Sequence, residues 1–243
     1  MNKVILVQSK KGGIGKSWSA LQLAHGLAKI TGENVLILTT DRQNDILSFS
    51  GYSEPLRRGL EYWIEHLEGD FAELRENLYY IPLNATIISE DLKNKFEVFM
   101  EALQNKFKYI VIDGTPVIEL NLLISSAATD IVIPTFLDKV TAVGMMEMLK
   151  RFELNKIKAV IPNRTAARSK LEKEYYSKLK EALEPTQIVL TCPINQSNFI
   201  SNLIEKGKTI WDTSSSKVTS VKEQFEKVIE VIKWWLEKIF LLV

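Results

Sequence analysis

The chain has 243 residues, of which 46% are hydrophobic and 25% charged, and its formal net charge is +1. This composition excludes a wholly disordered chain, and the length favours one α/β domain over residues 1–243 rather than two small ones. Because Cys192 is the only cysteine, an intramolecular disulfide, a cysteine-based zinc site and an iron–sulfur cluster are excluded, and a cytoplasmic location is expected.

Charge is unevenly distributed along the chain. Residues 54–101 carry 11 acidic and 5 basic side chains, whereas residues 151–180 carry 9 basic and 3 acidic ones. This segregation is compatible with one face that meets a polyanion. No apolar run is long enough to span a bilayer, so any membrane contact is expected to be peripheral.

A glycine-rich turn follows the first apolar stretch. Residues 4–7 are typical of a strand and residues 20–28 have helical spacing, so residues 8–17 connect a strand to a helix. Glycines there let backbone N–H groups approach phosphate oxygens at the positive end of a helix. Lys16 is expected to contact the β- and γ-phosphates, and the Ser17 hydroxyl to bind Mg²⁺. The residues expected to bind the nucleotide in this turn are Gly12, Gly13, Ile14, Gly15, Lys16, Ser17 and Trp18.

Residues 11–17 match the variant loop K-G-G-x-G-K-[ST] and resemble the ParA/MinD family of deviant Walker ATPases. The resemblance implies that Lys11 crosses a nucleotide-sandwich dimer to the phosphates held by the other subunit, which makes Lys11 a catalytic candidate with Lys16. The alternative for Lys11, and the main interpretation of Lys10, is a solvated surface charge.

The second predicted strand, residues 34–40, runs into a segment that resembles the family's switch I motif, D-x-D-P-Q. Asp41 and Gln43 match this motif, whereas Thr39 replaces its first aspartate and Arg42 its proline. Asp41 is predicted to orient the attacking water or a magnesium-bound water, and the alternative is a turn-forming aspartate. The missing first aspartate predicts slow turnover.

Residues 109–113 are predicted to form the fourth strand. Four apolar residues that end in Asp113 are typical of a Walker B strand, whose carboxylate emerges beside Mg²⁺, here through a water molecule. The following Gly114-Thr115-Pro116 resembles the family's switch II segment with one residue changed.

Two later segments also resemble the family. Residues 127–134 and 142–146 are similar to its next strand and helix, a region near the nucleotide-dependent dimer contact. The strand at 157–161 leads to Asn163, which the resemblance implies is a contact to the nucleotide base, because an amide offers both a donor and an acceptor. Arg164 is either its neighbour in that pocket or a surface charge.

A helix is predicted from 167 to 183, followed by a strand at 187–191. Partition ATPases of this family bind DNA without sequence preference through basic residues on their C-terminal face, although a charge run is more often a solvated helix face. The candidate DNA-binding residues are Arg168, Lys170, Lys206, Lys208 and Lys217. His25 and His66 are expected to be packing or surface residues.

The sequence thus predicts an α/β fold, a mostly parallel twisted sheet flanked by helices, of the P-loop NTPase class. The resemblance implies a ParA-type partition ATPase without an N-terminal helix-turn-helix, which dimerises on ATP and Mg²⁺ and is reset by a centromere-binding ParB-type partner. One alternative is a MinD-like membrane-cycling ATPase that uses the apolar end, residues 234–243, of a C-terminal helix spanning 220–243. Another is a ligase that activates a small acid with ATP.

Overall fold

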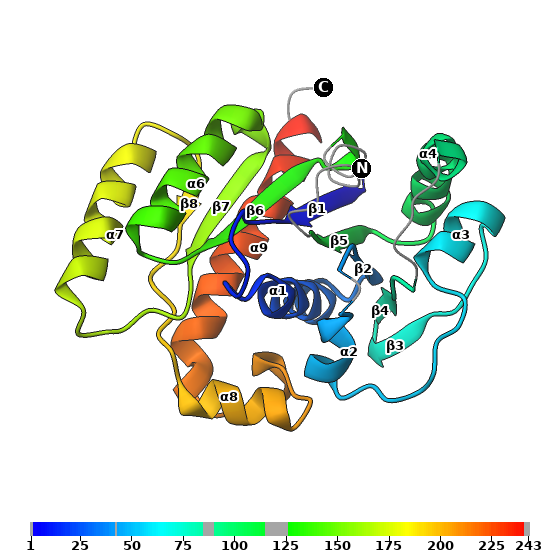
Figure 1. Cartoon of the computed structure of the whole chain (residues 1–243), viewed down its shortest axis with the longest axis horizontal. Helices are drawn as coiled ribbons and strands as arrows, with labels where there is room; N and C mark the ends of the chain where they lie inside the picture. The colour runs from blue at the N-terminus through cyan, green and yellow to red at the C-terminus, as the bar shows by residue number, and fades with distance from the viewer. Residues whose placement is uncertain (1, 42, 85–89, 115–125, 241–243) are drawn as a thin grey trace.

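The computed structural model describes residues 2–41, 43–84, 90–114 and 126–240. Within these ranges the chain forms an eight-stranded sheet in the order β3-β4-β2-β5-β1-β6-β7-β8, and helices lie on both of its faces (Figure 1). The strands are Lys3–Val7 (β1), Val35–Thr39 (β2), Ala72–Arg75 (β3), Leu78–Ile81 (β4), Tyr109–Asp113 (β5), Asp130–Thr135 (β6), Ile157–Pro162 (β7) and Val189–Leu190 (β8).

The central strands of the sheet are buried along their whole length. Every residue of β1, β2, β5 and β6 is buried, and these strands run parallel to their neighbours. Burial on both faces explains why their sequences are continuous apolar runs rather than alternating patterns. Asp113 at the end of β5 lies between Val7 of β1 and Thr39 of β2 in the register. The ends of these strands therefore meet at one edge of the sheet.

The helices bury two separate apolar layers against the sheet. One layer includes residues of α1, α2, α8 and α9, and the other includes residues of α3, α4, α6 and α7. The helices are Lys16–Thr31 (α1), Asp45–Ser50 (α2), Leu60–His66 (α3), Glu90–Gln104 (α4), Lys139–Arg151 (α6), Lys170–Leu183 (α7), Asn198–Glu205 (α8) and Thr219–Phe240 (α9). Short 3₁₀ helices occupy Leu154–Lys156, Ile210–Asp212 and Ser216–Val218.

The C-terminal helix α9 packs against α1. Gly26 permits the close approach, because a Cβ at this position would lie 2.6 Å from the Trp211 ring and 2.8 Å from the Ile229 side chain. Phe225 of α9 is fully buried, and its ring meets the edge of Trp18 at a centroid distance of 5.7 Å. The first residues of α1 are thereby fixed to the C-terminal part of the chain.

The main prediction, a mostly parallel sheet flanked by helices, is confirmed, but three details were wrong. The strand β3 was not predicted, so the strand at 109–113 is the fifth rather than the fourth. β3 pairs antiparallel with β4 through a tight turn in which Asn77 adopts a positive φ of 60°. The helix predicted from 167 begins only at 170, because the Ser169 hydroxyl caps it by accepting from the Glu172 N–H. The strand predicted at 187–191 is shortened to β8.

His25 is buried in the middle of α1, with its Nδ1 2.7 Å from the Thr209 Oγ1. Burial lowers the pKa of His25 from 6.5 to about 4, with Arg75 and Lys29 acting in the same direction and Asp212 opposing them. The unfolded chain therefore binds a proton near pH 6.5 that the folded chain does not accept until about pH 4. The stability that comes from neutral His25 is complete above pH 6.5 and declines as the pH falls toward 4.

We expect the free energy of unfolding to fall by about 2 kcal/mol more in the wild type than in His25→Gln between pH 7.5 and pH 5. Glutamine cannot take up the proton, whereas the other titratable groups are the same in both proteins. Urea denaturation at the two pH values measures the difference. Equal losses in the two proteins would show that His25 does not titrate on unfolding.

Candidate functional site

The loop between β1 and α1 is shaped by left-handed glycines. Gly13 has a φ of 72° and Gly15, which precedes the first residue of α1, has a φ of 89°. A Cβ at Gly15 would lie 2.5 Å from the Asn163 Nδ2, so a larger residue would displace the neighbouring loop. The loop therefore directs backbone N–H groups to the start of α1, where the helix dipole favours an anion.

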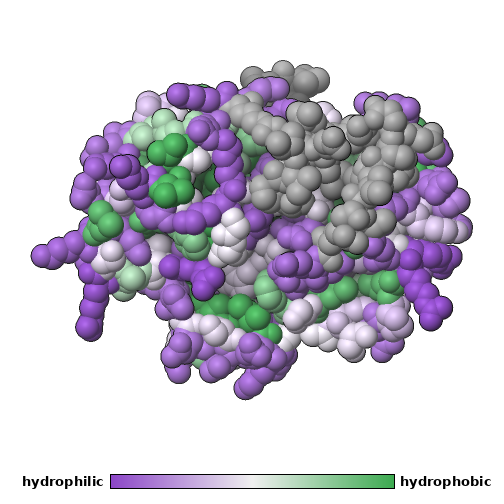
Figure 2. All heavy atoms as spheres, in the orientation of Figure 1, coloured by the Kyte–Doolittle hydropathy of each residue, from purple (hydrophilic) through white to green (hydrophobic). Residues whose placement is uncertain are grey.

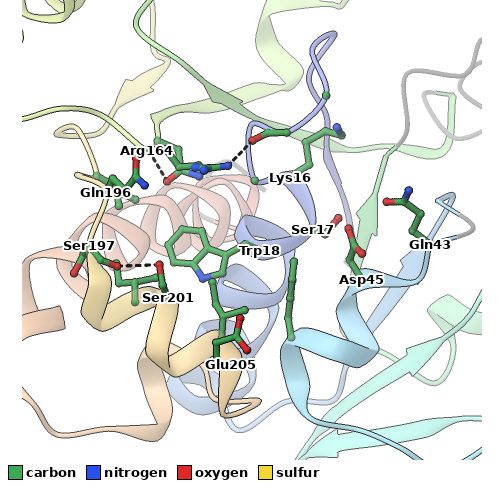
Figure 3. Close-up of a pocket in the computed structure, with 18 of the residues that line it drawn as sticks. Lys16, Ser17, Trp18, Gln43, Asp45, Arg164, Gln196, Ser197, Ser201 and Glu205 are labelled. Carbon is green, nitrogen blue, oxygen red and sulfur yellow. Dashed lines mark hydrogen bonds between the residues drawn. The ribbon is translucent and has the colours of Figure 1, made fainter.

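A cavity of about 700 Å³ opens in front of this loop (Figure 3). The end of the glycine-rich loop, the starts of α1 and α2, the loops after β7 and β8, and the helix α8 form its walls. The lining residues are Gly12, Gly13, Gly15, Lys16, Ser17, Trp18, Asp41, Gln43, Asp45, Phe49, Asn163, Arg164, Ile194, Asn195, Gln196, Ser197, Ile200, Ser201, Ile204 and Glu205. Glycine-loop, lysine, hydroxyl and carboxylate groups therefore converge on one space of the size typical of a ligand pocket.

Asn163 and Arg164 connect the end of β7 to the glycine-rich loop. The Asn163 amide donates to the Ile14 carbonyl oxygen at 2.9 Å and accepts from the Arg164 N–H at 2.9 Å. The Arg164 Nη1 donates to the Gly13 carbonyl oxygen at 3.2 Å, and the Arg164 backbone has a φ of 52°. Asn163 thus keeps one N–H and one lone pair that no hydrogen bond among the described residues uses. Ile14, which was expected to bind the nucleotide, is fully buried and is not among the residues that line the cavity.

The segment after β2 places Asp41 at the cavity. Thr39 is fully buried, and its hydroxyl accepts from the Asp41 N–H at 3.1 Å. The Asp41 carboxylate in turn accepts from the Gln43 N–H at 3.0 Å, an arrangement that closes a tight turn. Asp41 thus has both the turn-forming contact of the alternative interpretation and access to the cavity. Arg42 lies outside the described residues.

Asp113 is a buried carboxyl group beside the cavity. It is 1% exposed, and its Oδ2 has no hydrogen-bond partner among the described residues. Burial raises the pKa of Asp113 to about 7, with Asp41 and Asp45 acting in the same direction, while a hydrogen bond from Ser17 and the charge of Lys16 oppose them. Thr115 and Pro116 of the predicted switch II segment lie outside the described residues.

A carboxylate oxygen close to the Ser17 hydroxyl, and without a hydrogen-bond partner in the ranges that the structure describes, fits a hard cation such as Mg²⁺. In the described part of the chain, no group of three or more His, Cys, Asp or Glu side chains is arranged to hold a metal ion. The fit therefore requires oxygens from outside the protein, as in sites where Mg²⁺ keeps several waters and binds substrate phosphates.

Lys11 is directed away from the cavity and toward α6. Its Nζ lies 3.0 Å from the Asp138 Oδ2 and 5.2 Å from the centre of the Phe136 ring. Asp138 is held in place because its other oxygen caps α6 by accepting from the Thr141 N–H and hydroxyl, both at 2.7 Å. Lys10 forms an ion pair with Glu147 on the same helix. Two ion pairs therefore connect the start of the loop to α6.

The five candidate DNA-binding residues are all exposed but form two groups. Arg168 and Lys170 lie at the start of α7. Lys206 and Lys208 follow α8. The Lys217 Nζ lies 5.3 Å from the ring of Phe199, which belongs to α8. The loops that lead to α7 and α8 are joined by backbone hydrogen bonds from Thr165 to Ile194 and from Gln196 to Thr165, both of 3.0 Å.

Several lining residues were not predicted from the sequence. The apolar wall contributed by α2 and α8 includes Phe49, Ile200 and Ile204, and only tertiary packing brings these residues to the loop. Asp45 was also missed, although its position just after the switch I motif is a signal that sequence reasoning could have used.

Comparison with known proteins concerns the family of the chain. A family model described as an AAA domain matches residues 2–165. The sporulation initiation inhibitor protein Soj of Bacillus subtilis is 26% identical over 168 residues, a match that spans 63% of this chain and 66% of Soj.

Solved structures share the fold of the whole chain. A putative plasmid partition protein from Borrelia burgdorferi B31, bound to AMPPNP, matches with a TM-score of 0.75 at 20% identity, over 98% of this chain and all of that one. The MinD cell division protein of Aquifex aeolicus matches with a TM-score of 0.72 at 16% identity, over 95% of this chain and 96% of that one.

Proposed function

Because the chain belongs to the ParA/MinD family of deviant Walker ATPases, we propose that it is a DNA partition ATPase of the ParA type, which ATP switches between a monomer and a DNA-binding dimer. The observation that carries this proposal is the convergence of the glycine-rich loop, Lys16, Ser17 and Asp41 on one cavity, beside an oxygen of Asp113 that has no hydrogen-bond partner in the described part of the chain. The basic residues at the start of α7 and after the end of α8 supply the DNA contact.

The nucleotide site holds ATP with its phosphates in the glycine-rich loop. Lys16 binds the β- and γ-phosphate oxygens, the Ser17 hydroxyl and Asp113 hold Mg²⁺ with its waters, and Asp41 accepts a hydrogen bond from the attacking water. Bound Mg²⁺ supplies neutralisation of the phosphate charge. Arg164 covers the loop, and the remaining polar groups of Asn163 face the base. Hydrolysis is slow until a ParB-type partner completes the site.

Dimer formation brings the α6 sides of two subunits together, with Lys11 of each crossing to the phosphates of the other. Hydrophobic side chains gather over α6 on the molecular surface (Figure 2). Val140, Val143 and Met146 on this helix are 68%, 56% and 44% exposed. An apolar strip beside Lys11 suits an interface that forms and dissociates with the nucleotide state.

The ATP-loaded dimer binds DNA through phosphate contacts without base recognition. Lys206 and Lys208 follow α8 and Lys217 contacts its residue Phe199, and this helix also forms a wall of the nucleotide cavity. Occupancy of the cavity can therefore influence the basic surface directly. Exposed lysines without interleaved base-reading groups suit contact with the phosphate backbone.

The test is binding of unrelated duplex DNA to the protein loaded with ATP, with ADP or with no nucleotide, over a salt series. We expect binding only with ATP, with an affinity that decreases linearly in a plot of log K against log salt concentration. The double variant Lys206→Glu/Lys208→Glu should weaken binding and reduce the slope by about 3.6 for the dimer, because each of the four lost phosphate contacts removes about 0.9. Lys106→Glu is the matched control. Lys106 is also an exposed lysine, and it lies just after α4 rather than beside α7 or α8.

No DNA binding in any nucleotide state would overturn the partition proposal. The MinD-type alternative would then be tested with anionic vesicles and a variant that lacks residues 234–243. Among the described residues no helix is long and apolar enough to cross a membrane. The early part of α9 is already buried through Phe225, Val228, Ile229 and Ile232, so a membrane contact would have to use its end.

A further inference from the structure

Thr39 cannot take the place of the aspartate that it replaces in the switch I motif. Its side chain is fully buried, and its hydroxyl is bonded to the backbone of Asp41. It is also absent from the residues that line the nucleotide cavity. The cavity therefore lacks a carboxylate at the position where the family motif supplies its first one.

Asp45 brings a carboxylate into the same part of the cavity from the next helix. It is the first residue of α2 and lines the cavity together with Lys16, Ser17 and Asp41. In Figure 3 its carboxylate points toward the Ser17 side chain. Burial raises the pKa of Asp45, with the charge of Asp41 acting in the same direction and that of Lys16 opposing them, so both charges lie close to Asp45.

The position of Asp45 is fixed by its neighbour. Asn44 has a φ of 49°, and its Nδ2 donates to the Leu83 carbonyl oxygen at 2.8 Å. The Asn44 Oδ1 accepts from the Leu83 N–H at 3.0 Å and from the Tyr80 hydroxyl at 2.7 Å. These bonds attach the start of α2 to the end of β4. A fixed backbone at Asn44 suits a side chain that has to meet a ligand in a defined place.

A second observation indicates that a cation belongs beside these carboxylates. The Asp113 Oδ2 is buried and has no hydrogen-bond partner among the described residues, although Asp41 and Asp45 are close enough for their charges to act on Asp113. Three carboxylates near one hydroxyl leave an excess of negative charge, of which Lys16 compensates only part. A divalent cation with its waters would satisfy the unpaired oxygen and balance the charge.

We propose that Asp45 supplies the carboxylate that Thr39 lacks, by accepting a hydrogen bond from a water molecule on the Mg²⁺ ion that Ser17 binds with ATP. The inference rests on the ATP and Mg²⁺ binding of the proposed function. Contact through water agrees with the absence of a direct ligand cluster in the described part of the chain. Asp45 is thus a positioning residue for the metal rather than a catalytic residue.

The experiment measures the binding of a fluorescent mant-ATP at increasing Mg²⁺ concentration, with EDTA as the metal-free point. Asp45→Asn should raise the Mg²⁺ concentration for half-maximal binding by about 10- to 100-fold, the usual effect of losing an outer-shell partner. Binding in EDTA should remain at the wild-type level. Glu205→Gln is the matched control, because Glu205 lines the same cavity from the end of α8. Mn²⁺ electron paramagnetic resonance gives a second readout of metal affinity.

The outcomes separate this inference from the proposed function. Wild-type protein that binds mant-ATP without any Mg²⁺ dependence would overturn both. A wild-type Mg²⁺ dependence that is unchanged in Asp45→Asn would overturn only the role of Asp45, as would an equal loss of binding with and without Mg²⁺. Asp45→Ser is the second variant in case the first does not fold, because it also removes the carboxylate and leaves the N-cap residue Asn44 unchanged.

Discussion

Replacing Lys16 with alanine is expected to raise the Kd for ATP by roughly a hundredfold or more. Lys16 is the first residue of α1, and its side chain lines the nucleotide cavity. Hydrogen bonds from its ammonium group to phosphate oxygens are charge-assisted, and each is worth about 1.5 to 3 kcal/mol. Titration of the variant with mant-ATP in the presence of Mg²⁺ measures the loss.

Lys10→Ala is the control for this substitution. Lys10 belongs to the same loop, but its ammonium group pairs with Glu147 of α6 and it is not among the residues that line the cavity. Its removal should leave the Kd for ATP within about threefold of the wild-type value, because exposed ion pairs contribute little. Equal losses in Lys10→Ala and Lys16→Ala would mean that the effect comes from the loop's positive charge as a whole.

The central part of the fold could be predicted because its signals are local. Buried parallel strands are continuous apolar runs, and the glycine-rich turn between Val7 and Lys16 can adopt few structures other than a strand-to-helix connection. Asp113 was placed at a strand end for the same reason. These elements need no knowledge of distant contacts.

The strand β3 could not be predicted in this way. It has only four residues, in which the two buried positions, Ala72 and Leu74, alternate with the polar residues Glu73 and Arg75. It exists because Asn77 allows a tight turn and because Arg75 is held by Asp212 at 3.0 Å from another part of the chain. A short edge strand of this kind depends on tertiary contacts, which the local pattern does not contain.

Only part of the candidate site could be predicted from the sequence. The phosphate-binding end follows from a contiguous motif, whereas α8 reaches the cavity from a position almost 200 residues further along the sequence. The contact of Asn163 with the loop carbonyl is also a tertiary feature. The resemblance implied a base contact for this residue, and the structure adds a loop-fixing bond that uses half of its amide.

The position of Lys11 leads to the second large effect. Its ammonium group faces Asp138 and the Phe136 ring rather than the cavity of its own subunit. Removing it should therefore leave ATP binding to the monomer nearly unchanged. In the proposed dimer, however, two symmetric lysine–phosphate contacts are lost together, so Lys11→Ala should weaken dimerisation by roughly 3 to 6 kcal/mol, or about 10²- to 10⁴-fold.

Sedimentation equilibrium with ATP and with ADP measures this loss, and mant-ATP titration checks that the nucleotide is still bound. Asp138→Asn is the matched control, since it removes the same intramolecular ion pair but leaves Lys11 in place, and asparagine still caps α6. We expect this control to dimerise with ATP. Normal dimerisation of Lys11→Ala would show that Lys11 makes no contact that the dimer needs. An equally complete loss in Asp138→Asn would show that Lys11 acts through its ion pair within the monomer and not through a contact across the dimer.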